Sequence, residues 1–166
     1  MEELSDIDKK NLEFFEQMEH SKGESDRGLV LFSAAQIDHY LTRVLRAFLI
    51  DDISVDDMFN GPFAPFSTLS GKTTAAFGMG LISREEAKRI DAVRKIRNIF
   101  AHEIKASFDH EAVKKLCAKA PIYNGHLSDR DAFLHMALNI IPHLMYRDIH
   151  VSAEWKRQEM TEGKAG

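Results

Sequence analysis

Apolar residues recur at intervals of three and four along most of this chain, and this spacing constrains its fold more than any other feature. Between residues 25 and 50 the series consists of Val30, Ala34, Ile37, Leu41, Val44 and Phe48. These intervals match the period of an α-helix. No segment shows the sustained apolar–polar alternation of a half-buried strand, and no run rich in Val, Ile and Thr is bounded by turns. We therefore predict an all-α fold.

Length and composition indicate one domain. The chain has 166 residues, of which 44% are hydrophobic and 29% are charged, as in globular proteins with a sizeable core. We expect a single bundle of roughly five to six helices over residues 1–160 and a flexible tail over residues 161–166. The expected helices cover about 5–20, 25–50, 67–79, 83–103, 109–120 and 128–158.

Local signals mark several helix ends. Ser83 and Glu86 form a capping box at the start of the fourth helix, and Gly80 is placed to end the third. Asp109 is placed to cap the fifth helix. Pro142 is expected to kink the last helix, because its ring blocks the hydrogen bond to residue 138.

The sequence offers no signal for a cofactor, a metal or a membrane span. Its single cysteine, Cys117, excludes an intramolecular disulfide and zinc sites that need two or more cysteines, and we expect it to be a small core residue. The histidines are scattered without metal-ligand spacing. No window approaches about 18 uninterrupted apolar residues, and the acidic N-terminus lacks the apolar region of a signal peptide. We expect a cytoplasmic location.

The charge balance argues against direct DNA binding. The net charge is −4, whereas non-specific DNA binding depends on phosphate neutralisation by Lys and Arg. The most basic region covers residues 88–105, but Asp91 and Glu103 are interleaved with its basic residues. No helix-turn-helix with a basic second helix is recognisable. We interpret the basic region as a solvated helix face.

The segment from Arg97 to His102, at the end of the fourth predicted helix, carries the strongest candidate for chemistry. Arginine has a fixed charge that can pair with a phosphate or carboxylate through two hydrogen bonds, and histidine titrates near neutrality. At about 100° per residue from Ile90, the apolar side chains of this helix fill an arc from roughly 180° to 300°. Arg97 falls at about 340°, on the shoulder of this arc, whereas Asn98 and His102 fall at about 80° and 120°, on the polar side.

Two interpretations of Arg97 remain open on these grounds. One is a ligand-binding role, and the other is an ion pair, because a charge beside an apolar arc must be paired or reach water. The candidate partners for the ion pair are the carboxylates of Glu24, Asp26 and Asp38, on or just before the second helix. The candidate structural or binding cluster consists of Glu24, Asp26, Arg27 and Asp38. For its N-terminal part, capping of the second helix is the alternative to a functional role. His102 can likewise be a histidine that favours the C-terminal end of the helix dipole.

Arg97 and His102, separated by four residues and with Asn98 after the arginine, resemble the R-x4–6-H motif of the HEPN superfamily. Domains of that superfamily are small, all-helical and typically dimeric, and many are metal-independent ribonucleases while others are non-catalytic. The resemblance implies a homodimer in which two copies of the fourth helix form a cleft. There Arg97 would bind the scissile phosphate, His102 would move a proton and Asn98 would orient either group.

A longer series of segments resembles the mannitol operon repressor (MtlR) family. It consists of residues 23–28, 40–52, 61–62, 66–67, 80–83, 96–98, 100–102 and 107–109. This resemblance covers more than half of the chain, and it implies a transcriptional regulator of the repressor type. Because the sequence lacks a DNA-reading helix, such a regulator is expected to act through contacts with a partner protein. The alternatives are a HEPN-type ribonuclease, which would act on RNA, and a non-catalytic interaction or antitoxin module.

Overall fold

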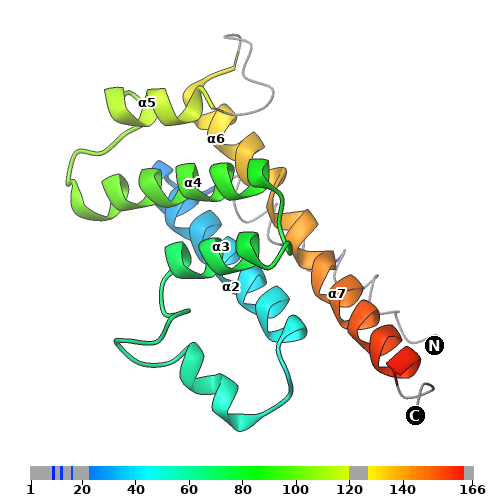
Figure 1. Cartoon of the computed structure of the whole chain (residues 1–166). Coiled ribbons are helices and arrows are strands. Elements are labelled where there is room, and N and C mark those ends of the chain that lie inside the picture. Colours follow the sequence, from blue (N-terminus) through cyan, green and yellow to red (C-terminus); the bar gives the residue numbers. More distant parts are fainter. Residues whose placement is uncertain (1–8, 10–11, 13–15, 17–22, 120–126, 163–166) are drawn as a thin grey trace.

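The computed structural model describes residues 23–119 and 127–162, together with Lys9, Leu12 and Glu16. Its elements are α2 (Asp26–Phe48), the 3-10 helix η1 (Ile53–Met58), α3 (Leu69–Gly78), α4 (Arg84–His102), α5 (Glu111–Cys117), α6 (Asp129–Leu138) and α7 (Ile141–Glu162) (Figure 1). The described part contains no strand, so the predicted all-α bundle is confirmed. Most of the predicted helix over 5–20 and the end of the predicted tail, 163–166, lie outside the described residues, whereas α7 includes Thr161 and Glu162.

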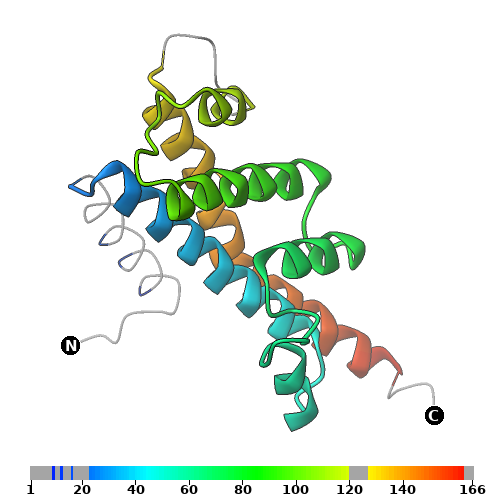
Figure 2. The ribbon, with the colours of Figure 1, turned by 90° about the vertical axis from the view of Figure 1, so that its left-hand side faces the viewer.

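The helix α2 is the central element, because it contacts α3, α4, α6 and α7. Its apolar side chains cover more than one face, and Leu29, Ile37 and Leu41 are fully buried. Ser25 caps its first turn by accepting a hydrogen bond from the Gly28 amide at 3.1 Å. As Figures 1 and 2 show, α7 lies along α2, and α4 crosses α2.

Helices α3 and α4 form an antiparallel pair on α2, joined by a tight turn (Figure 1). Gly80 has φ +73°, which glycine adopts without a steric penalty, and it ends α3 as predicted. The capping box between Ser83 and Glu86 at the start of α4 is also present. Because α4 is the longer helix, its C-terminal end extends past the start of α3 (Figure 2).

Two predicted details of the C-terminal half are wrong. The cap of α5 is His110, whose Nδ1 accepts from the Ala112 amide at 3.3 Å, and Asp109 lies one residue earlier. The predicted last helix is two helices, since α6 ends at Leu138 and α7 begins at Ile141. Pro142 therefore lies in the first turn of α7 and does not kink a longer helix. In the first turn a backbone N–H has no partner within the helix, so proline costs no hydrogen bond there.

Glu86 joins the start of α4 to α7. Its carboxylate accepts hydrogen bonds from the Ser83 amide at 2.7 Å and from Arg147 at 2.9 Å, and Arg147 also donates to the Leu81 carbonyl at 2.8 Å. Burial alone would raise the pKa of Glu86, but the hydrogen bonds from Arg147 and Ser83 outweigh it, so the pKa is lowered. The buried carboxylate is thus held ionised at neutral pH.

No helix within the described ranges has both the length and the apolar character needed to cross a membrane.

Candidate functional site

Arg97 lies on the surface of α4 and contacts its neighbour in sequence. Its Nη1 donates to the Asn98 Oδ1 at 3.2 Å, and Asn98 is half-buried. Arg97 makes no ion pair with any side chain in the described part of the chain. Its exposure differs from the position expected on the shoulder of the apolar arc, whose members Val93, Ile96 and Phe100 are fully buried.

The carboxylates considered as partners of Arg97 have other contacts. Asp26 accepts from Arg130 at 3.0 Å, and the backbone carbonyl of Glu24 accepts from the same guanidinium at 3.2 Å. Asp38 pairs with the buried Lys72 at 2.7 Å. Within the described residues Arg97 forms an ion pair with none of these carboxylates, which contradicts the ion-pair interpretation. Asp26 and Asp38 instead bind cations that only the tertiary fold brings to them.

Arg27 is the arginine that closes the end of α4. Its guanidinium donates to the carbonyl oxygens of Phe100, of Glu103 at 2.7 Å and of Ile104 at 3.2 Å. The last carbonyls of a helix lack intrahelical partners, and a cation there also favours the helix dipole. Sequence reasoning placed Arg27 in a possible cluster but missed this role, since the partners lie more than 70 positions away.

A hollow of about 810 Å³ lies between α2, α3 and α4. Its α4 wall carries Arg94, Arg97 and Asn98, and its α2 wall includes Ala34 and Asp38. The guanidinium and the amide of the motif therefore border the same concave surface. This arrangement was not accessible from the position of Arg97 on an isolated helix.

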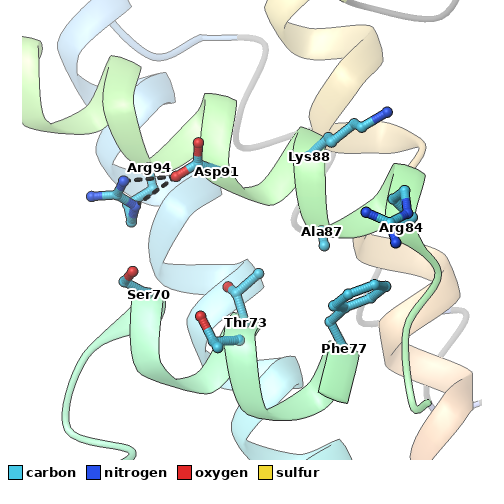
Figure 3. A pocket seen from close by; sticks show the side chains of 9 residues that line it. Ser70, Thr73, Phe77, Arg84, Ala87, Lys88, Asp91 and Arg94 are labelled. Carbon is cyan, nitrogen blue, oxygen red and sulfur yellow. Dashed lines mark hydrogen bonds and ion pairs between the residues drawn. The ribbon is translucent and has the colours of Figure 1, made fainter. Parts of the chain in front are cut away.

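A second hollow, of about 320 Å³, continues along the same pair of helices (Figure 3). It shares Ser70 and Arg94 with the first, and its far end is bordered by Phe77 and Arg84. The two hollows together form a groove between α3 and α4, which we call the α3–α4 groove.

Two of the four described cations that border this groove, Lys88 and Arg94, are paired within α4. Asp91 accepts from Arg94 at 2.7 Å (Figure 3) and also pairs with Lys95 at 2.7 Å, so these two cations share one carboxylate. Lys88 pairs with Glu85 at 2.8 Å. Partial burial would raise the pKa of Asp91, but the hydrogen bonds from Lys95 and Arg94 lower it. These pairs within one helix favour the interpretation of the basic region as a solvated face.

His102 lies outside the α3–α4 groove. It is exposed in the last turn of α4 and is not among the residues that border either hollow. The reason is geometric, because His102 follows Asn98 by one turn and α3 does not extend that far along α4. From Arg97 to His102 the helix rises about 7.5 Å and rotates by roughly 140°. Within one chain the two side chains therefore face different surroundings.

Neither Cys117 nor a metal cluster adds chemistry to this site. Burial, together with the charge of Asp129, raises the pKa of Cys117 to about 12, so the thiol stays protonated at neutral pH. Across residues 23–119 and 127–162, His, Cys, Asp and Glu nowhere form a group of three or more that could hold a metal ion.

No protein-family model, curated protein or solved structure matches this chain. The resemblances to the mannitol operon repressor family and to the HEPN motif therefore stay predictions. The geometry itself defines a groove with an arginine and an amide at one end. Such groups bind carboxylates or phosphates through charge-assisted hydrogen bonds.

Proposed function

We propose that this chain is a non-enzymatic transcriptional regulator of the repressor type that acts in the cytoplasm by binding a partner protein. One observation carries the proposal: Arg97 lies exposed at the end of a groove and forms no ion pair within the described residues. Arg27, not Arg97, binds the backbone carbonyls at this end of α4. Arginines beside a concave surface are frequent energetic centres of protein interfaces.

Partner binding accounts for the charge distribution better than DNA binding does. Lys88 pairs with Glu85, and Arg94 and Lys95 share Asp91 on the same helix. These cations are therefore less able to replace the counterions of DNA phosphates. The net charge of −4 adds a general repulsion. A regulator with this surface would change transcription through the protein that it contacts.

The test is co-purification from cells of the source organism, using wild-type protein, Arg97→Ala and the matched control Lys115→Ala. Lys115 lies on α5 in an exposed pair with Glu111, away from the groove. We expect one partner to be retained by wild type and control and lost with Arg97→Ala, and transcript levels to change in the cells that carry Arg97→Ala. Finding only self-association, or equal recovery with all three proteins, would contradict the proposal. A partner lost without any change in transcripts would favour a non-catalytic interaction or antitoxin module.

A homodimer, which the HEPN resemblance implies, is a separate part of the proposal. Sedimentation velocity at micromolar protein concentration measures it directly. If the protein is a monomer at all concentrations tested, the homodimer part of the proposal is wrong and the partner-binding part stands.

A HEPN-type ribonuclease is the second candidate. Arg97 and Asn98 are joined by a hydrogen bond and face an open groove, as a phosphate-binding pair would, and His102 is exposed one turn away. Incubation of the purified protein with RNA in EDTA tests this candidate. Cleavage that disappears with His102→Ala would establish it and overturn the non-enzymatic proposal, whereas no cleavage, or cleavage unaffected by the substitution, would end it.

A further inference from the structure

The α3–α4 groove has an available positive charge at each end. At one end is Arg97, and at the other is Arg84, whose guanidinium lies 5.1 Å from the centre of the Phe77 ring. Neither arginine pairs with a carboxylate among the described residues. They are thirteen positions apart on one helix, which corresponds to about 20 Å along its axis and a rotation of about 140° around it. Despite this rotation, each arginine borders one of the two joined hollows.

Between the two arginines the groove carries no free positive charge of its own. Arg94 is held by Asp91, and the α3 wall presents the exposed hydroxyl-bearing residues Ser70 and Thr74. Phe77 and Ala87 add apolar surface at the Arg84 end (Figure 3). A ligand that follows the groove therefore meets charge, then neutral hydrogen-bonding groups, then charge and an apolar wall.

We propose that the α3–α4 groove binds an extended acidic segment of the partner protein, with two carboxylates spaced to reach Arg84 and Arg97. An extended chain advances about 3.3 Å per residue, so a span of about 20 Å corresponds to roughly six positions from one acidic residue to the other. This inference rests on the partner-binding function proposed above and specifies the chemistry of the segment that is bound.

Single-stranded RNA fits the same groove less well. Its backbone carries a negative charge at every nucleotide, whereas the two arginines without an ion pair border the groove about 20 Å apart along α4. Asp38 and Asp91, which also border the groove, already pair with Lys72 and with Arg94 and Lys95. A peptide with neutral residues between its two acids matches the spacing of the two arginines. Charge complementarity therefore favours a protein segment.

The experiment uses two defined probes with the full-length protein. The first is a fluorescein-labelled peptide of serine, alanine and glycine with two glutamates about six residues apart, and the second is a labelled uridine oligonucleotide. Fluorescence anisotropy measures the binding of each to wild type, Arg84→Ala, Arg97→Ala and Lys115→Ala. Because both arginines are exposed, we expect the variants to fold, and their circular dichroism and thermal unfolding check this.

We expect the peptide to bind wild type and Lys115→Ala alike and to bind each arginine variant about ten-fold more weakly, as the loss of a charge-assisted hydrogen bond predicts. Moving the two glutamates to adjacent positions should weaken binding to a similar extent. Peptide binding that is absent, or unchanged in both arginine variants, would overturn the inference, and so would tighter binding of the oligonucleotide. Arg84→Ala is also added to the co-purification. If co-purification depends on Arg97 but neither co-purification nor peptide binding depends on Arg84, the proposed function stands and this inference fails.

Discussion

Arg27 and Arg97 lie near the same helix end and have opposite roles. From the first turn of α2, Arg27 donates to the Phe100 carbonyl in the last turn of α4 and to the carbonyls of Glu103 and Ile104 just after it. Arg97 lies on α4, and its side-chain hydrogen bond within the described residues is to Asn98. The motif in the sequence contains Arg97. In the fold, however, Arg27 binds the carbonyls at the end of α4, and no local pattern distinguishes Arg27 from other arginines near a helix start.

We predict that Arg27→Ala lowers the free energy of unfolding by about 1–2 kcal/mol, because hydrogen bonds from a charged group to helix carbonyls are lost. Arg97→Ala should change it by less than about 0.5 kcal/mol, as is usual for an exposed residue without a structural partner. Urea unfolding followed by circular dichroism compares the two variants with wild type. Equal destabilisation by both would contradict the assignment of roles.

The Glu86 carboxylate gives a prediction about pH. Its pKa is lowered in the folded protein from an ordinary value of 4.5, so its stabilising contribution is complete above pH 4.5 and is lost as the pH falls through the lower, folded value. Glu86→Gln should therefore be less stable than wild type by about 1–2 kcal/mol at pH 7. The difference should shrink as the pH falls below 4.5.

Unfolding in urea at several pH values between 7 and 3 measures this difference. The conservative Glu85→Gln is a matched control, because Glu85 lies beside Glu86 on α4 but its pair with Lys88 is exposed. A gap between Glu86→Gln and wild type that does not depend on pH would show that packing, rather than the charge, explains the effect.

At the scale of elements, α3 is positioned by a close approach of backbone. A Cβ atom on Gly71 would lie 2.4 Å from the Pro65 carbonyl oxygen, so the segment before α3 can pass this close only because residue 71 is glycine. Gly78, at the other end of the same helix, has open space around its Cβ position. The two glycines thus provide a matched pair on one wall of the groove.

We predict opposite effects of alanine at these two positions. Gly71→Ala should destabilise the protein by about 1–3 kcal/mol, because the clash outweighs the higher helix propensity of alanine. Gly78→Ala should stabilise it by up to about 1 kcal/mol, since only the propensity changes. Thermal unfolding compares the two, and stabilisation by both substitutions would mean that the approach of Pro65 does not constrain residue 71.

The sequence predicted those element ends that depend on neighbouring residues. The capping box of Ser83 and Glu86 and the glycine at position 80 were confirmed, because each acts within a few residues of its own helix end. The predicted cap of α5 was off by one residue. At Pro142 a kinked helix was predicted, whereas the structure has two helices, and the break between them precedes Pro142. These ends depend on how the helices pack. Neighbouring residues such as Asp109 and His110 can both cap a helix, so the local sequence does not choose between them.

At the scale of the whole molecule, the single cysteine lies at the end of α5, which packs against α4 and α6. Cys117 is fully buried, and the pKa of its thiol is raised to about 12. We predict that the thiol resists labelling by a disulfide reagent at pH 8 in the native protein and reacts stoichiometrically in urea, because labelling requires the packing around α5 to open. Its labelling should follow the same urea transition as circular dichroism. Complete labelling within minutes in the absence of urea would contradict this.

The sequence by itself determined the helical class, the main helix ranges and the buried face of α4, because helical periodicity and end caps are encoded within a few turns of chain. Only the tertiary structure decided which arginine serves the fold and which faces a groove. Arg27 with Phe100, Asp26 with Arg130, and Asp38 with Lys72 are pairs between segments 34 to 104 positions apart. Such pairs exist only once α2 has packed against α3, α4 and α6, so no local spacing can specify them.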